Sequence, residues 1–445
     1  MLMVDSAIKR NFMWVPINQI DNPDRVMEVL TVHSKYEDNP SVRLCRYSED
    51  MEYMGFPRNI SGLEVGDLVD NTVYYKSRNI NFKGILRKNQ VPLVQIFQEK
   101  LEDGVTDMIV NSPPGTGKTV MLLNFIAELN TPTLVVVPKA DLVEQWRDRI
   151  LTFTNIPESK IGYARQKVCD FKDKTVVLGM LQSLYKDRYG QEFTNYFGCV
   201  VFDELHRLGS YHFSKVVGMF PARYRIGATA TLKRSDGMSN IFFAHLGSNV
   251  IKQTISTQPK PSVYVVQFNK SSGEIPSYLT GKVHRRGKLI SLLSENIRRS
   301  RMIANLAIQI AQSGRQTLVI SEKIEQLKLF KELLKKDFKP EEIGLYIGKT
   351  SEEDREYIKK NCKIILATTS MLGLGTDIPT LRGLIFATPV SSIEQIVGRI
   401  CRIKKGTKDP IVVDIVDTYY KVSSGWFSAR MRYYNKNKYL VKYGR

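Results

Sequence analysis

Residues 112–119 read SPPGTGKT, a segment that could bind the phosphates of a nucleoside triphosphate. Gly115 and Gly117 allow the backbone to curl so that successive N–H groups point at a phosphate, at the start of the following helix. Lys118 would reach the β- and γ-phosphates, and the Thr119 hydroxyl would hold Mg²⁺. The runs MIVNS before the loop and MLLNFIAEL after it predict the strand and helix that such a loop needs. The expected nucleotide contacts in the loop are Gly115, Thr116, Gly117, Lys118 and Thr119.

Two adjacent carboxylates follow 85 positions after Lys118, in the run CVVFDELH at 199–206. The run predicts an apolar strand that ends in Asp203 and Glu204 at the carboxyl edge of a parallel sheet, where ligands bind in such folds. Asp203 would hold Mg²⁺, and Glu204 would orient and deprotonate the attacking water as general base. An acid pair at a strand end is common, so this interpretation depends on the phosphate loop that precedes it.

A third segment, QIVGRICR at 395–402, carries positive charge. Phosphoryl transfer spreads negative charge over the γ-phosphate oxygens, and Arg399 and Arg402 would stabilise that charge as a cationic fork. Gln395 would help to place the attacking water. Two arginines in a helix usually lie on a solvated face, so this interpretation also rests on the other motifs. Together the three segments predict an enzyme that hydrolyses Mg-ATP rather than one that only binds it.

The elements that must position these residues follow an α/β pattern from about residue 83. Apolar runs alternate with amphipathic stretches such as TVMLLNFIAELN and ADLVEQWRDRILTF, which predicts a parallel sheet covered on both faces. The alternation restarts after the polar segment TISTQPKPS at 254–262, so we expect two α/β lobes joined by a linker. The predicted strands are MIVNS, TLVVVP, TVVLGM and CVVFDE in the first lobe and QTLVIS, KIILAT, GLIFAT and IVVDIV in the second.

Residues 1–82 form a separate compositional unit, with 9 Lys and Arg against 12 Asp and Glu. Short runs rich in β-branched and aromatic residues, FMWVPI, EVLTVHSKY, SVRLCRY, MEYMGF and NTVYYK, predict strands. DNPD, EDNP and ISGLEVGD are interpreted as turns between them. We expect a small β-rich accessory domain that either binds nucleic acid or braces the two α/β lobes.

The composition of the 445-residue chain allows two to four domains and favours a polyanionic partner. It has 65 Lys and Arg against 45 Asp and Glu, a net charge of +20, and nucleic acid fits this excess best. The five cysteines are scattered and never spaced C-x-x-C, which argues against a disulfide framework, a zinc ribbon or an iron–sulfur cluster. No run approaches the roughly 18 apolar residues of a membrane span. We therefore expect a cytoplasmic protein with no membrane partner.

Two segments concentrate the basic charge. Residues 282–301 are rich in Lys and Arg and predict a basic helical face or loop. Residues 418–445 contain seven Lys and Arg, no acidic residue and eight aromatic residues. Basic and aromatic side chains interleaved in this way can hold phosphates and stack on bases. The alternative is a C-terminal helix that packs its aromatic side chains on the second lobe and leaves its charges in water.

With these motifs in place, the chain resembles a superfamily 2 helicase of the DExH type over roughly residues 83–417. LRKNQ at 86–90 resembles the adenine-reading segment of that family, with Gln90 as a base contact. GATAT at 227–231 resembles the element that couples hydrolysis to lobe movement, which implies roles for Thr229 and Thr231. His206 would link the ATP site to that element, with a structural role as the alternative. The implied fold is α/β, with two tandem RecA-like parallel-sheet lobes and a β-rich N-terminal domain.

The resemblance also implies contacts with nucleic acid. TLVVVPKADLVEQW and LGMLQSL resemble the strand-binding segments of the first lobe, and TLVIS and ATTSMLGLGTDIP resemble motifs four and five of the second. The implied nucleic-acid contacts are Pro138, Lys139, Gln182, Ser183, Arg234, Thr368 and Thr369, and Gly375 and Asp377 are implied for the nucleotide. The implied domains are an accessory domain at 1–82, an ATP-binding lobe at 83–253, a second lobe at 254–417 and a basic aromatic tail at 418–445.

Two departures from the family pattern are visible. Ser112 stands where Gly or Ala begins the phosphate loop. The segment from Thr368 to Gly375 is one residue longer than the commonest spacing, which leaves Thr368 or Thr369 as the phosphate contact. Neither change removes a group that the ATPase chemistry needs.

A narrower resemblance concerns the substrate. ATLKRSDGM at 230–238 and RYSEDMEYMGFPRNI at 46–60 resemble segments of a group that includes nucleotide-excision-repair, phage recombination and poxvirus transcript-release helicases. We therefore expect a monomeric phage helicase that remodels duplex or branched DNA in the host cytoplasm, by branch migration or fork regression, with a single strand in the motor groove. Three alternatives stay open: an RNA-acting or transcript-release motor, a translocase subunit of a restriction enzyme, and an ATP-gated clamp without turnover.

Overall fold

The chain forms two compact units, Met1–Ser256 and Thr257–Arg445. The computed structural model describes residues 2–35, 41–75, 78–113, 115–207, 211–234, 236–253, 259–269, 286–372, 378, 380–390, 393–401 and 408–444. Within these residues, no helix has both the length and the apolar character needed to cross a membrane.

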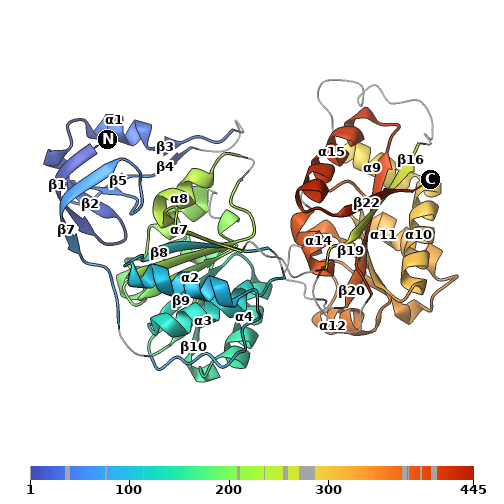
Figure 1. Cartoon of the computed structure of the whole chain (residues 1–445), viewed down its shortest axis with the longest axis horizontal. Helices are drawn as coiled ribbons and strands as arrows, with labels where there is room; N and C mark the ends of the chain where they lie inside the picture. Colours follow the sequence, from blue (N-terminus) through green and yellow to red (C-terminus); the bar gives the residue numbers. More distant parts are fainter. Residues whose placement is uncertain are drawn as a thin grey trace. The chain divides into compact units, whose positions relative to one another are not determined.

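The N-terminal part of unit 1 is a five-stranded sheet in the order β5-β6-β2-β1-β7 (Figure 1). Three of the predicted element assignments were wrong. DNPD, interpreted as a turn, begins helix α1, with Asn22 at its N-cap. ISGLEVGD, interpreted as a turn, contributes strand β7, because residues 63–70 pair in parallel with residues 2–9 of β1. The described part of NTVYYK forms only an isolated bridge at Val73. The element bounds are β1 Leu2–Lys9, β2 Met13–Pro16, η1 Ile17–Gln19, α1 Pro23–Val29, β3 Thr31–Val32, β4 Val42–Arg43, β5 Arg46–Tyr47, β6 Tyr53–Phe56 and β7 Leu63–Asp70.

The rest of unit 1 is built on an eight-stranded sheet in the order β11-β10-β12-β9-β13-β14-β8-β15. Its described strands pair in parallel except β10 with β11. The four predicted strands of this lobe are confirmed as β8 Asp107–Asn111, β9 Thr133–Val137, β12 Val176–Met180 and β13 Cys199–Asp203. The remaining strands are β10 Ile161–Arg165, β11 Val168–Asp170, β14 Tyr224–Thr229 and β15 Val250–Lys252.

Helices cover both faces of this sheet, as its continuous apolar strands predict. In β9, Val135 and Val137 enter the core beneath α2, α3 and α4, whereas Leu134 and Val136 enter the opposite core beneath α6, α7 and α8. The helix bounds are α2 Val91–Glu102, α3 Lys118–Leu129, α4 Ala140–Phe153, η2 Glu158–Lys160, α5 Leu181–Leu184, α6 Gly190–Thr194, η3 Leu205–Arg207, α7 Tyr211–Val217 and α8 Ser239–Leu246.

A buried charged network joins the N-terminal sheet to the eight-stranded sheet. Asp107, at the start of β8, accepts hydrogen bonds from Arg225 Nε and Nη2 at 2.8 and 2.9 Å and from Asn59 Nδ2 at 2.8 Å. Arg58 Nη2 lies 3.2 Å from the same carboxylate. Burial alone would raise the pKa of Asp107, but the two guanidinium groups lower it overall. Because β8 and β14 begin here, the accessory domain is docked at the edge of the sheet opposite the phosphate loop.

His245 completes this interface. Its backbone carbonyl accepts from Arg225 Nη2 at 2.6 Å and from Asn59 Nδ2 at 2.8 Å. Its ring meets the edge of Phe12, with centroids 5.6 Å apart. Burial, followed by the charge of Arg225, lowers the pKa of His245 to about 3. The imidazole is therefore neutral wherever the interface is intact near neutral pH.

Unit 2 is a seven-stranded parallel sheet in the order β18-β19-β17-β20-β21-β16-β22 (Figure 1). The predicted strands of the second lobe are confirmed as β17 Gln316–Ser321, β19 Ile364–Thr368, β20 Leu381–Phe386 and β21 Ile411–Asp417. The other elements are β16 Ser262–Phe268, α9 Arg286–Glu295, α10 Ile297–Gln312, α11 Ile324–Leu334, η5 Pro340–Glu342, β18 Ile343–Tyr346, α12 Glu352–Asn361, α13 Thr369–Leu372, α14 Glu394–Ile400, α15 Lys421–Lys436 and β22 Leu440–Tyr443.

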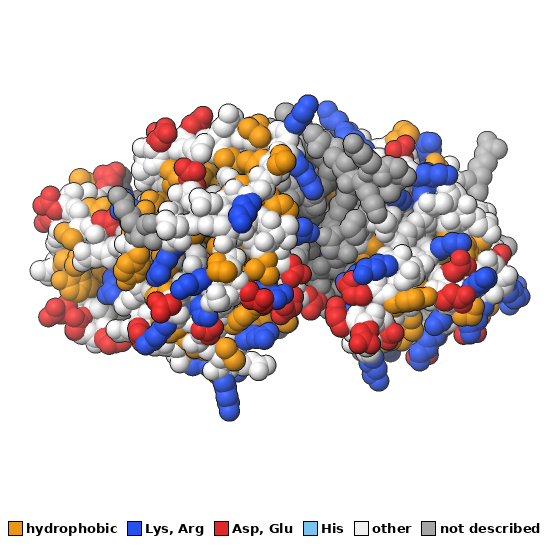
Figure 2. All heavy atoms as spheres, turned by 90° about the horizontal axis from the view of Figure 1, so that it is seen from below, with side chains coloured by type: hydrophobic (Ala, Val, Ile, Leu, Met, Phe, Trp, Pro, Cys, Tyr) orange, Lys and Arg blue, Asp and Glu red, His pale blue; other side chains and the backbone are white. Residues whose placement is uncertain are grey.

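The basic C-terminal segment is part of this second sheet domain. Its strand β22 pairs with β16, and α15 packs on the core through the fully buried Tyr434. Arg430 and Tyr434 both bond to the buried carboxylate of Asp414. The packing alternative therefore describes Tyr434, but Arg430 is buried in an ion pair with Asp414 and not left in water. The 282–301 segment is likewise not wholly a surface, because Arg299 forms a buried ion pair with Asp417. On the face that Figure 2 displays, Lys and Arg side chains are interspersed with Asp and Glu.

Candidate active site

The phosphate loop connects β8 to α3 and carries its own hydrogen bonds. Gly115 and Gly117 have φ values of 76° and 86°, in the left-handed region that glycine adopts without strain. Lys118 begins α3 and donates from Nζ to Ser112 O at 3.1 Å. Thr116 Oγ1 donates to a carbonyl of the loop at 2.6 Å. A left-handed turn directly before a helix N-terminus is the geometry that binds phosphate.

Gln90 lies directly against this loop. It precedes α2 with its side chain buried, and Nε2 donates to Thr116 O at 3.0 Å and to Gly117 O at 3.3 Å. A Cβ atom on residue 117 would stand 2.4 Å from Gln90 Nε2, so only glycine permits this approach. The amide is thus tied to the loop, and its contact with adenine stays a prediction.

The two carboxylates lie at the end of β13, as predicted: Asp203 is its last residue and Glu204 follows directly. Asp203 Oδ1 accepts from Glu204 N at 2.9 Å, and Oδ2 accepts from Trp146 Nε1 at 2.9 Å. Burial, followed by the charge of Glu204, raises the pKa of Asp203 to about 6, and Lys118 opposes that shift. Glu204 itself has a left-handed backbone, with φ of 55°, a strained conformation of the kind that clusters at active sites.

The donor set here fits a bound Mg²⁺. Mg²⁺ takes oxygen ligands, usually one or two carboxylates together with phosphates and water. Asp203 supplies a buried carboxylate, and Thr119 supplies a hydroxyl in the first turn of α3. A cation beside Asp203 would also offset the burial and the repulsion from Glu204 that raise its pKa.

Three further predicted residues connect the acids to the loop. His206 Nδ1 lies 3.4 Å from Glu204 Oε2 and 3.2 Å from Thr229 Oγ1. Thr229 Oγ1 also accepts from Thr231 N at 3.0 Å and donates to Thr231 O at 2.9 Å. The Ser112 N–H donates to Thr229 O at 3.1 Å, at the start of the phosphate loop. Groups from three strand ends are therefore hydrogen-bonded into one cluster.

Arg234, predicted to contact nucleic acid, is held within this cluster. Its guanidinium donates to the His206 carbonyl and to both carboxylate oxygens of Asp236. The side chain therefore links the segment after β14 to the DELH segment, and a contact with nucleic acid stays a prediction.

The predicted strand-binding segments of unit 1 also lie together. Pro138 O, at the end of β9, accepts from Gln182 Nε2 at 2.8 Å. Lys139 occupies the N-cap position of α4, and its side chain makes no capping hydrogen bond. Ser183 is buried, and its Oγ accepts from Gln166 N at 2.7 Å, so its hydroxyl has a role in the fold.

The second-lobe residues are placed in unit 2. Thr368 ends β19 and Thr369 begins α13, so the two adjacent threonines stand at the carboxyl edge of that sheet. Gln395 and Arg399 lie on α14, one turn apart. Three predicted residues lie outside the described part of the chain: Gly375, Asp377 and Arg402.

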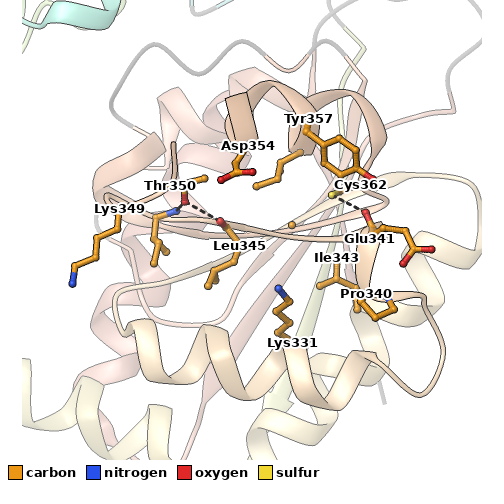
Figure 3. A pocket seen from close by; sticks show the side chains of 13 residues that line it. Lys331, Pro340, Glu341, Ile343, Leu345, Lys349, Thr350, Asp354, Tyr357 and Cys362 are labelled. Atoms are coloured by element: carbon orange, nitrogen blue, oxygen red, sulfur yellow. Dashed lines mark hydrogen bonds between the residues drawn. The ribbon is translucent and has the colours of Figure 1, made fainter. Parts of the chain in front are cut away.

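Unit 2 also has a pocket of about 370 Å³ beside the edge strand β18, between α11 and α12 (Figure 3). Lys331 points into it from α11, and Tyr357 and Asp354 border it on α12. Thr350 Oγ1 donates to Leu345 O at 3.0 Å in its wall. None of the predicted site residues lines this pocket.

Sequence reasoning missed two residues that contact the site. Trp146 reaches Asp203 from the buried face of α4, where a Trp at helical spacing cannot be distinguished from ordinary core packing. Gln253, directly after β15, accepts a hydrogen bond from Ser112 Oγ, which also contacts Thr116 Oγ1 at 2.6 Å. The departure at Ser112 was visible in the sequence, but its partner 141 positions away was not.

Comparison with known proteins shows the family of the chain. Residues 83–234 match the family described as type III restriction enzyme, res subunit, and residues 299–404 match the helicase conserved C-terminal domain. A "Putative ATP-dependent RNA helicase" of Acanthamoeba polyphaga mimivirus is 32% identical over 421 residues, which cover 92% of this chain and 79% of that protein. A "Probable helicase" of Escherichia phage T5 is 27% identical over 342 residues, which cover 74% of this chain and 72% of that protein.

The fold is also found among solved structures. The Hef helicase domain of Pyrococcus furiosus is similar with a TM-score of 0.50 at 15% identity, over 78% of this chain and 100% of that chain. The chain belongs to the superfamily 2 helicases and is related to helicases of viruses and a phage. It is therefore an ATP-using enzyme of a family whose substrate is nucleic acid.

Proposed function

We propose that this helicase hydrolyses Mg-ATP with the residues at the carboxyl edge of the eight-stranded sheet, and that it uses the cycle to remodel branched DNA. The observation that carries the ATPase assignment is the hydrogen-bonded cluster of Ser112, Thr229 and His206 beside Glu204. These contacts connect the phosphate loop to the acids, so a shift of the loop on nucleotide binding can change the position of Glu204.

Each residue of the cluster has a separate task. Lys118 would exchange the Ser112 carbonyl for the β- and γ-phosphates, because charged oxygens are the stronger acceptors. Thr119 and Asp203 would hold Mg²⁺, which neutralises phosphate charge when bound. Glu204 would orient the attacking water and take its proton. His206 would pass the change at Glu204 to Thr229, and so to the GATAT turn.

Residues of unit 2 would complete the reaction. Arg399 and Arg402 would stabilise the charge that develops on the γ-phosphate, and Gln395 would help to place the water. Gly375 and Asp377 would contact the nucleotide. If these groups act only when the lobes approach each other, hydrolysis is linked to lobe movement. The strand would then be held by the nucleic-acid contacts predicted in the two lobes: Pro138, Lys139, Gln182, Ser183, Arg234, Thr368 and Thr369.

The DNA assignment is supported by the segment 46–60 and its role in docking. Strands β5 and β6 lie in this segment, and its Arg58 and Asn59 bind Asp107 of the ATP-binding lobe. The accessory domain is thus joined to the first lobe by buried charges and hydrogen bonds. An accessory domain attached to the first lobe in this way would hold one arm of a DNA junction while the two lobes move along another arm.

An RNA-acting motor is the second candidate, because the mimivirus relative is named as an RNA helicase. ATP hydrolysis should be measured at fixed salt with four activators in turn: single-stranded DNA, duplex DNA, a four-way DNA junction and single-stranded RNA. Strongest stimulation by duplex or branched DNA supports branch remodelling, and preference for RNA replaces it with a transcript-acting motor. Absence of turnover with all four would favour an ATP-gated clamp instead.

The role of the C-terminal segment in DNA binding can be tested with point substitutions. Truncation is unsuitable because it would remove the buried Tyr434. Lys436 and Lys438 are exposed. If they bind phosphates, their joint replacement by Ala should weaken DNA binding and reduce the salt dependence of log K by up to about 0.9 per lost contact. The matched control replaces Lys328 on α11 and Lys335 at its C-cap, which are also exposed. Equal affinity and salt dependence in both variants would exclude a role of the segment in DNA binding.

A further inference from the structure

The indole of Trp146 is the feature of this site that neither the motifs nor the proposed chemistry accounts for. It is carried by α4, is 1% exposed, and donates from Nε1 to Asp203 Oδ2 at 2.9 Å. The other carboxylate oxygen, Oδ1, accepts from the Glu204 N–H at 2.9 Å. Each oxygen of Asp203 therefore has one fixed donor.

We propose that Trp146 is a positioning residue that orients the Asp203 carboxylate for Mg-ATP. This inference rests on the proposed role of Asp203 as a Mg²⁺ ligand. An ionised carboxylate has about four lone-pair sites, so two remain for the metal or its water after the two donors are bound.

The orientation has to be imposed from outside Asp203. The terminal torsion of an Asp side chain has a broad, two-fold energy profile and does not select one plane by itself. The Glu204 N–H fixes only one oxygen, and it belongs to a strained residue that must also orient water. The indole supplies the second point, so the two donors together define the plane of the carboxylate.

The helix that carries the indole is well suited to this task. Val143 and Ile150, one turn before and after Trp146, are fully buried in the same core. A rigid, packed helix can hold a hydrogen-bond donor at a constant position relative to the metal ligand that it orients. Loss of such donors typically lowers metal affinity or activity by roughly 10- to 100-fold.

The test replaces Trp146 by Phe, which keeps an aromatic ring and removes the N–H donor. Trp14→Phe is the matched control, because Trp14 Nε1 donates to Asn11 Oδ1 at 3.1 Å in the accessory domain. Binding of a fluorescent ATP analogue to the full chain is titrated with Mg²⁺ and repeated in EDTA. We expect the Trp146→Phe protein to need about a 10- to 100-fold higher Mg²⁺ concentration for half-maximal stimulation of analogue binding. Its affinity for the analogue in EDTA should equal that of the wild type.

The other outcomes contradict the proposal. A folded Trp146→Phe protein with the wild-type Mg²⁺ requirement would leave the indole with packing alone. Equal losses with and without Mg²⁺ would show general damage to the nucleotide site. Asp203→Asn separates the two hypotheses: if this variant keeps the wild-type Mg²⁺ requirement, the proposed role of Asp203 is wrong, whatever Trp146 does.

A second measurement tests the proposal even if the Trp146→Phe protein fails to fold. The chain has three tryptophans, so a Trp14→Phe/Trp426→Phe protein leaves Trp146 as its single indole fluorophore. Addition of Mg²⁺ to the nucleotide-bound protein should change its emission, because the bonded carboxylate gains a cation. Emission that does not respond to Mg²⁺, in a protein that binds Mg-ATP, would overturn the proposal.

Discussion

Replacement of Asp107 by Ala is expected to destabilise unit 1 severely. Asp107 is 4% exposed. Its carboxylate accepts two hydrogen bonds from Arg225 and one from Asn59, and it forms an ion pair with Arg58. Both arginine side chains are fully shielded from solvent. Without the carboxylate, two guanidinium groups would remain buried beside each other with no negative charge between them.

The magnitude follows from the burial. Removal of one partner of a buried ion pair typically costs about 3–5 kcal/mol, and Asp107 serves two cations, so we expect about 5 kcal/mol. In a unit of this size about 1 kcal/mol lowers Tm by roughly 2–4 °C, which corresponds to roughly 10–20 °C. The Asp107→Asn side chain keeps one oxygen acceptor, so this variant should lose less stability than Asp107→Ala.

Thermal unfolding followed by circular dichroism and by tryptophan fluorescence measures this effect. The control is Glu192→Ala, which removes an ion pair with Lys172 whose side chains are both 70% exposed, and it should melt like wild type. An Asp107→Ala protein that melts within about 3 °C of wild type would refute the reasoning. It would mean that water or rearranged acceptors compensate the two arginines.

Three further predictions concern the ATP site and the interface. Lys118→Ala should abolish ATP turnover, while Glu204→Gln should retain binding of a fluorescent ATP analogue and stop hydrolysis; retained hydrolysis in the Glu204 variant would exclude it as general base. His245 has a pKa of about 3 when folded and about 6.5 when unfolded, so only the unfolded state binds its proton between these values. Stability should therefore fall by about 1.4 kcal/mol per pH unit below pH 6.5, and less steeply in His245→Gln; equal slopes in urea titrations would contradict this. In a double-mutant cycle, Ser112→Ala and Gln253→Leu should show a coupling of about 0.5–3 kcal/mol, and strict additivity would mean that their hydrogen bond contributes nothing.

Elements with strong local patterns were predictable in detail. The amphipathic stretch ADLVEQWRDRILTF coincides with α4, and each predicted strand of the two lobes is present. The strands are buried on both faces, so their apolar runs are continuous and their type does not depend on one particular neighbour. The phosphate loop was equally visible, because its glycines and lysine act at adjacent positions.

The accessory domain was harder to predict for a physical reason. Residues 63–70 contain Gly66 and several acids, and only their pairing with β1 makes them a strand. Strand preference at such an edge depends on what lies beside it, which a local pattern does not record. The same holds for the basic segment 282–301, where Arg299 turned inward because Asp417 offers a buried partner.

By itself, the sequence determined the class of chemistry: a phosphate loop, an acid pair at a strand end and an arginine pair, in an order that indicates an ATP-driven motor. Only the tertiary structure decided which side chains support that chemistry. Trp146 meets Asp203 across 57 positions of the chain, and Ser112 meets Gln253 across 141. Contacts of this kind leave no spacing pattern, because the distance along the chain between two hydrogen-bonded groups is set by the packing of whole helices and strands.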